Sequence, residues 1–239
     1  MVLPLGRPIS GRTPAERVPD CSRRTLAAQW MTGVGCLLAA AALGAVLHGT
    51  RGPTGLDLLA ARVIGPPSPV PATVALAAAR LADREPAIMY FLLVAVAGGL
   101  LYRHGRPIVA VLASGAAAQG LVLFGKHLVD RTAFTAGPSY PSGHMAGATA
   151  VWVLVVLLAA GRGRRAAGLV GLTIGLLPVA TALGAIWTQS HVWTDVLGGG
   201  LIGTGTALLS WWVFVPPVPV RPLPPHLPWR TTARGNEGS

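Results

Sequence analysis

Two histidines of this chain stand in surroundings that suit catalysis. His144 follows a Pro-Ser-Gly turn, and His191 lies four residues before Asp195. At that spacing His191 and Asp195 share one face of a helix or of its first turn, where a carboxylate can fix the imidazole tautomer and raise its basicity. An imidazole activated in this way is a candidate nucleophile. We therefore interpret His191 as the attacking residue and Asp195 as its partner.

The turn before His144 is a candidate anion site. The run Pro141-Ser142-Gly143-His144 leads directly into an apolar stretch that extends to Ala160. A helix that begins here presents free backbone N–H groups and the Ser142 hydroxyl at its N-terminus, where phosphate is favoured. Taken alone, such a histidine is more often a cap than an acid catalyst. Its combination with His191 and Asp195 at a membrane boundary favours a functional site, because ionisable groups there are costly.

The elements that position these residues must be membrane helices. The chain has 239 residues, of which 52% are hydrophobic and only 11% are charged, and its mean hydropathy is +0.57. This composition is typical of a polytopic all-α membrane protein. The two cysteines, Cys21 and Cys36, have no metal-ligand spacing and are not expected to pair. We expect neither a metal nor another cofactor.

Apolar stretches long enough to cross a bilayer predict a bundle of six transmembrane helices. The first is expected to be an uncleaved span, with a signal peptide as the competing interpretation. Between the first two spans, residues 56–83 are apolar but broken by four prolines, which favours short helices along the membrane surface. The expected spans are Leu26–Leu47, Ala87–Tyr102, Pro107–Gly125, His144–Ala160, Ala166–Trp187 and Val196–Val215.

Charge predicts the orientation of this bundle. Residues 1–25 are expected to be a disordered basic tail, 26–215 the membrane domain, and 216–239 a Pro/Arg-rich tail. With both tails in the cytoplasm, thirteen of the nineteen Lys and Arg residues lie inside. The positive-inside rule therefore predicts cytoplasmic termini and an extracytoplasmic site in the cell membrane. Topology and the bilayer account for the net charge of +11, so we expect no nucleic-acid partner. The oligomeric state is not predicted.

The order of these residues resembles a known family signature. Lys126, then Pro141-Ser142-Gly143-His144, then His191 with Asp195, is similar to the three motifs of the type 2 phosphatidic acid phosphatase superfamily, which includes lipid phosphate phosphatases and haloperoxidase-like proteins. The resemblance extends from about Ala87 to Phe214. In that family the motifs are Lys, six residues, Arg-Pro; Pro-Ser-Gly-His; and Ser-Arg, five residues, His, three residues, Asp.

The resemblance implies a role for each matched residue. His191 would attack phosphorus and form a phosphohistidine, Asp195 would orient it, and His144 would protonate the leaving alkoxide. Three further residues would bind the phosphate oxygens, namely Lys126, Ser142 and Gly143. Lys126 alone is weak evidence, since a lysine that extends toward the membrane interface is an equal alternative.

Two departures make this chain a divergent member of the family it resembles. Ala133 and Phe134 occupy the Arg-Pro positions, and Gly184 and Ala185 occupy the Ser-Arg positions. Both motif arginines are therefore absent, and with them a charge-assisted clamp worth about 1.5–3 kcal/mol per hydrogen bond. Arg131, two positions before Ala133, is the candidate substrate-binding substitute on that side.

Three functions are compatible with the sequence. The first is an integral membrane phosphatase that hydrolyses a lipid phosphate or diphosphate, phosphatidate-like or polyprenyl. The second is a lipid phosphotransferase with the same His, His, Asp set, because enzymes resembling sphingomyelin synthases lack the arginine of the third motif. The third is a catalytically weak or inactive member that binds a lipid or a protein.

Overall fold

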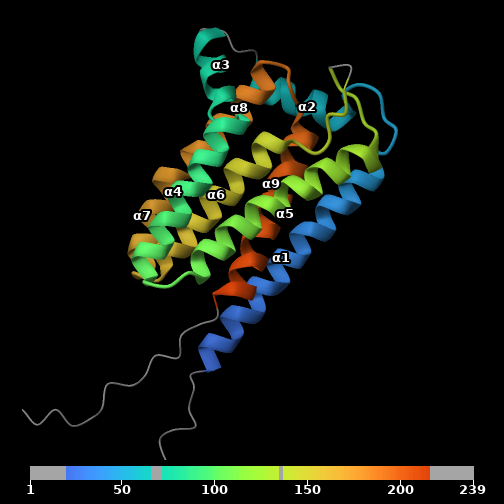
Figure 1. Ribbon diagram of the computed structural model, residues 1–239. Coiled ribbons are helices and arrows are strands. Elements are labelled where there is room, and N and C mark those ends of the chain that lie inside the picture. The colour runs from blue at the N-terminus through green and yellow to red at the C-terminus, as the bar shows by residue number, and fades with distance from the viewer. Residues whose placement is uncertain (1–19, 66–71, 135–136, 216–239) are drawn as a thin grey trace, which may run out of the picture. The chain divides into compact units, whose positions relative to one another are not determined.

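A computed structural model describes residues 20–65, 72–134 and 137–215 of the chain. These residues form nine helices, in agreement with the predicted all-α class (Figure 1). The predicted tail at 216–239, and the first nineteen residues of the other predicted tail, lie outside the described residues. The helices are α1 (Asp20–Leu47), α2 (Gly55–Ile64), α3 (Ala72–Arg80), α4 (Arg84–Tyr102), α5 (Arg106–Val129), α6 (Gly143–Ala160), α7 (Arg164–Ile174), α8 (Leu176–Trp187) and α9 (Trp193–Phe214).

The bundle has the surface of a membrane protein. Within the described residues, six segments are long and apolar enough to cross a membrane, with α7 and α8 together supplying the fifth. Large apolar side chains point outward along them, such as Leu38 on α1 and Leu172 on α7, which are 66% and 77% exposed. In water this exposure would be costly, whereas in a bilayer it places hydrocarbon against hydrocarbon. The chain is a multi-pass membrane protein.

Several helix boundaries differ from the sequence prediction, and α1 already begins at Asp20, within the predicted tail. Helix α5 does not stop at Gly125 but continues to Val129, so Lys126 lies within its last turn. Helix α9 begins at Trp193, which puts Asp195 in its first turn. The fifth span is interrupted at Gly175, because Pro178 has no N–H to donate to the carbonyl of Ile174.

The predicted short helices between the first two spans are α2 and α3. Helix α2 starts with a capping box, in which Thr54 accepts from the backbone N–H of Asp57 and Asp57 accepts from that of Thr54. Figure 1 shows α2 and α3 at the end of the bundle where α4, α6 and α9 begin. The two arginine-rich turns, α4–α5 and α6–α7, lie at the opposite end (Figure 1).

Helices α6 and α9 meet backbone to backbone. A Cβ atom at Gly199 would lie 2.2 Å from the carbonyl oxygen of Ser142, and one at Gly203 would lie 2.3 Å from that of Ala146. No side chain larger than hydrogen fits at either position without moving a helix. The four-residue spacing of the two glycines thus brings the first turns of α6 and α9 together.

Candidate active site

The N-terminus of α6 is tied directly to the start of α9. Ser142 is the N-cap of α6, is fully buried, and accepts a hydrogen bond from the backbone N–H of Met145. Its own N–H donates to the backbone carbonyl of Asp195, with an N···O distance of 3.0 Å. The capped helix end is therefore fixed beside the carboxylate that the sequence paired with His191.

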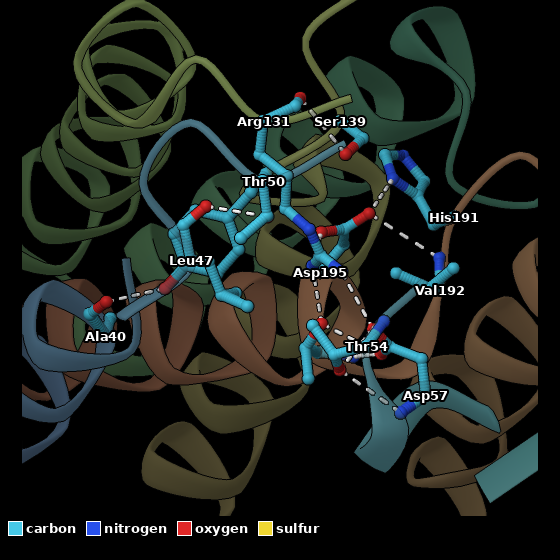
Figure 2. Close-up of polar contacts among 12 residues, drawn as sticks. Ala40, Leu47, Thr50, Thr54, Asp57, Arg131, Ser139, His191, Val192 and Asp195 are labelled. Carbon is cyan, nitrogen blue, oxygen red and sulfur yellow. Dashed lines mark hydrogen bonds and ion pairs between the residues drawn. The ribbon is translucent and has the colours of Figure 1, made fainter. Parts of the chain in front are cut away.

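His191 and Asp195 come together as the sequence predicted. His191 lies just before α9, next to Asp195 (Figure 2). His191 is 7% exposed, and Asp195 is fully buried. The Nδ1 atom of His191 is 3.7 Å from Oδ2 of Asp195, longer than a hydrogen bond, and Nδ1 has no other partner among the described residues. Catalytic contacts often shorten only when substrate binds. With Nδ1 directed at the carboxylate, Nε2 is the nitrogen left for attack.

His144 stands opposite His191 and has a carboxylate of its own. The two imidazole rings are 6.0 Å apart between centroids and inclined at 64°. The Nε2 atom of His144 lies 2.9 Å from Oδ1 of Asp83, in a half-exposed pair. A cationic imidazole has an N–H on each nitrogen, so His144 can keep Asp83 and still offer a proton to another oxygen.

Arg131 is placed differently from the sequence prediction, which made it a substrate ligand. Its side chain is fully buried, and its terminal nitrogens face two carboxylates (Figure 2). Nη1 is 2.7 Å from Oδ1 of Asp195, and Nη2 is 2.7 Å from Oδ2 of Asp57. Nη1 also donates to the hydroxyl of Thr194. Two carboxylates bind its terminal nitrogens, so the guanidinium contacts Asp195 rather than an open phosphate site, while its Nε has no hydrogen-bond partner among the described residues.

Sequence reasoning missed three polar residues of this site: Asp57, Asp83 and Thr194. All three lie outside the recognised motif positions. The pattern Thr54-x-x-Asp57 does indicate a capped helix start, and Asp83 is an acid close to a predicted membrane span, a place where ionisable groups are usually functional. Which partner each would meet depends on how α2 and α4 pack, and the sequence alone does not give that.

Lys126 faces the same end of the bundle from the last turn of α5. It is half-buried, and within the described part of the chain it forms no ion pair. Its predicted phosphate contact, like those of Ser142 and Gly143, stays a prediction.

The packing of α3 leaves no room for the serine of the third motif, and burial leaves none for its arginine. A Cβ atom at Gly184 would lie 2.3 Å from the backbone nitrogen of Ala79, so a serine there would collide with α3. The neighbouring Ala185 is 3% exposed, which leaves no room for an arginine side chain. The serine position of the motif therefore lies against α3, and its arginine position is buried.

Metal binding was not expected from the sequence. Among the described residues, no three His, Cys, Asp or Glu side chains are grouped so that they could bind a metal ion. The expectation that catalysis needs no metal stays a prediction.

The fold and these facing histidines define a polytopic helical membrane protein of the transmembrane phosphatase type. The family model described as PAP2 superfamily matches residues 86–217, more than half of the chain, so the protein belongs to this superfamily. Its structure is similar to the "first transmembrane PAP2 type phosphatidylglycerolphosphate phosphatase from Bacillus subtilis", with a TM-score of 0.59 and 19% sequence identity. The match covers 75% of this chain and 94% of that one. A comparison with curated proteins gave no match.

Restoring the arginine of the first motif is expected to raise turnover. Ala133 is half-buried in the turn after Arg131, so the change Ala133→Arg places a cation at the family's phosphate-binding position, whereas an arginine at Ala185 would have no room. We expect phosphate release from simple lipid phosphates to increase about tenfold, which corresponds to about 1.4 kcal/mol of transition-state stabilisation. Phe134→Arg is the matched control, because it adds the same charge at an exposed neighbouring side chain. Equal gains in both variants would show that net charge, not position, causes the effect.

Proposed function

We propose that this protein is a membrane phosphatase that hydrolyses a lipid phosphate or diphosphate through a phosphohistidine intermediate. The observation that carries this proposal is the facing pair of imidazoles, with ring centroids 6.0 Å apart and each imidazole beside a carboxylate. One imidazole can attack a phosphoryl group while the other protonates the group that leaves.

The reaction would have two steps. In the first, Nε2 of His191 forms a bond to phosphorus as the bond from phosphorus to the leaving oxygen breaks, and His144 gives that oxygen a proton. In the second, a water molecule attacks the phosphohistidine, His144 takes its proton, and His191 is released with inorganic phosphate. Asp195 stabilises the positive charge that His191 carries between these steps. The backbone N–H groups at the start of α6 and the ammonium group of Lys126 would stabilise the phosphoryl oxygens.

An apolar cavity beside the site supports a lipid substrate. A space of about 370 Å³ lies between α1, α5 and α9, and its lining is almost entirely apolar. At one end the cavity is lined by Pro141 and Gly125, the neighbours of Ser142 and Lys126. A phosphate group on the α6 N-terminus would thus lie close to a slot suited to a hydrocarbon chain.

Phosphate release by the purified protein tests the proposal. The panel should contain phosphatidate, phosphatidylglycerol phosphate and a polyprenyl diphosphate, each measured with and without an acceptor lipid that has a free hydroxyl. Release of inorganic phosphate without an acceptor supports a phosphatase. Transfer only in the presence of the acceptor would indicate the phosphotransferase, and no reaction under either condition would leave a binding role.

Filling the cavity should raise KM for long-chain substrates and leave KM for short-chain substrates unchanged. Ala41 lines it from α1, and the change Ala41→Leu adds volume where a hydrocarbon chain would lie. We expect KM for a long-chain lipid phosphate to rise about three- to tenfold, in line with about 0.8 kcal/mol per excluded methylene, while KM for a short-chain phosphate stays unchanged. Equal effects on both substrates would contradict this use of the cavity.

The proposed orientation places the site outside the cytoplasm. We expect reporter fusions after Arg106 and after Arg165 to be cytoplasmic, and a fusion near Ala136 to be external, because the arginine-rich turns lie at the end opposite the site (Figure 1). An external reporter after Arg165 would show that the protein has the opposite orientation.

A further inference from the structure

Asp57 is the most heavily hydrogen-bonded carboxylate among the described residues, although it lies outside the matched family region. It is 4% exposed and belongs to α2, which is not one of the six membrane spans. Its Oδ2 accepts from the backbone and hydroxyl of Thr54 at 2.8 and 2.7 Å and from Arg131 at 2.7 Å. Its Oδ1 accepts from the backbone and hydroxyl of Thr194 at 2.9 and 2.8 Å.

These contacts favour an ionised Asp57. Burial works against the charged form, but hydrogen bonds from Thr194 and Thr54 outweigh it and lower the pKa of Asp57 below its ordinary value. The buried cluster therefore contains two carboxylates and one guanidinium, and its formal charge is −1. This negative charge lies next to the imidazole that must become cationic in the proposed reaction.

The geometry also divides the hydrogen bonds of Arg131. Because Asp57 binds Nη2, Nη1 is the one terminal nitrogen of Arg131 that binds Asp195, and it uses Oδ1 of that carboxylate. The other oxygen of Asp195 remains directed at His191. Without Asp57, Arg131 could bind both oxygens of Asp195 in the bidentate geometry that guanidinium and carboxylate prefer. Asp195 would then be drawn away from His191, and its charge would be neutralised.

We infer that Asp57 is a positioning residue of this site, which acts through Arg131 and Thr194 to keep one oxygen of Asp195 and a net negative charge directed at His191. The inference rests on the proposed function for its effect on turnover. Its effect on the reactivity of His191 is independent of any substrate.

The first test is kinetic. Asp57→Asn keeps the shape of the side chain and removes its charge. We expect kcat for phosphate release to fall about 10- to 100-fold with KM changed less than threefold, because the lost charge acts on the intermediate and not on substrate binding. Asp130→Asn is the matched control: it removes a carboxylate from the adjoining position, where Asp130 forms an exposed ion pair with Arg51, and should leave kcat unchanged. A folded Asp57→Asn protein with unchanged kcat would overturn the inference.

The second test needs no turnover. Diethyl pyrocarbonate transfers its ethoxycarbonyl group to a neutral imidazole nitrogen, and mass spectrometry gives the modification rates of His191 and His144 in one sample. His144 is an internal reference, because its carboxylate is Asp83 and not Asp57. At alkaline pH, where imidazoles are neutral and the rate reports their nucleophilicity, we expect the ratio of His191 to His144 modification in Asp57→Asn to fall about three- to tenfold. An unchanged ratio would overturn the inference even if the protein proved to be inactive on every lipid tested.

A third variant tests the inference if Asp57→Asn does not fold. Thr194→Val removes only the hydroxyl that links Arg131 to Asp57, keeps every charge, and preserves the side-chain volume. If Asp57→Asn does not fold, a fall of about threefold or more in the His191 to His144 ratio in Thr194→Val supports the inference, and no change contradicts it. If wild type releases no phosphate but the His191 to His144 ratio still falls in the variants, the proposed function is wrong and the role of Asp57 stands.

Discussion

Replacing His191 with alanine is expected to abolish phosphate release, with a fall in kcat of about 10⁴-fold or more. No neighbouring side chain can take over the attack, since His144 has its Nε2 on Asp83 and Asp195 is fully buried against Arg131. Losing a nucleophile removes the covalent step altogether, and such losses are among the largest that single substitutions cause. The measurement is single-turnover phosphate release by purified wild type and His191→Ala.

The same pair of proteins tests the intermediate. Brief reaction with a ³²P-labelled substrate followed by alkaline quenching should leave label on wild type and none on His191→Ala, because a phosphohistidine survives base. Label retained by the variant would show that another residue is the nucleophile. Wild type that releases phosphate without ever retaining label would favour direct attack by water.

Replacing His144 with alanine should lower kcat by a factor that depends on the leaving group. For an alkyl phosphate, whose alkoxide must be protonated as it departs, we expect kcat to fall about 10²- to 10⁴-fold, the range typical of a lost general acid. For p-nitrophenyl phosphate, whose leaving group needs no proton, the fall in the first step should be about tenfold or less. Burst kinetics with both substrates separates this step from hydrolysis of the intermediate.

A matched variant separates acid catalysis from anion binding. Asp83→Asn removes the charge beside His144 but leaves the imidazole in place. The fall in kcat should therefore be smaller than in His144→Ala, and it should depend on the leaving group in the same way. If His144→Ala impairs both substrates equally, His144 binds the phosphate and does not act as the acid.

The fold was largely predictable because membrane helices are encoded by local composition. Six apolar stretches of sufficient length gave the six spans, and the family resemblance is confirmed by the match over residues 86–217. The boundaries were less accurate where neighbouring helices decide them. Helix α5 runs past Lys126 to Val129, although the sequence suggested that the charged residue would end it. A lysine in the last turn of a helix is stabilised by the helix dipole, so its charge does not mark the boundary.

The site was predictable only where its residues are close in sequence. His191 and Asp195 lie on one turn, and Ser142 caps the helix that it begins, so short-range spacing was sufficient. The contacts of Arg131 were not predictable, because its two carboxylate partners lie 74 and 64 residues away and the choice between them and a phosphate depends on the packing of α2. The same holds for Gly184, whose lack of a side chain is explained only by the position of α3.

The glycine contact between α6 and α9 has a consequence for how the protein tolerates different membranes. A bilayer thinner than the apolar length of the helices makes them tilt, and a site assembled across long, flexible side chains would change its dimensions with every such tilt. Here the carbonyls of Ser142 and Ala146 lie directly against Gly199 and Gly203, so α6 and α9 should tilt as one unit. His144 and His191 lie at the same end of this unit, and the distance between them should therefore be insensitive to the thickness and composition of the surrounding lipid.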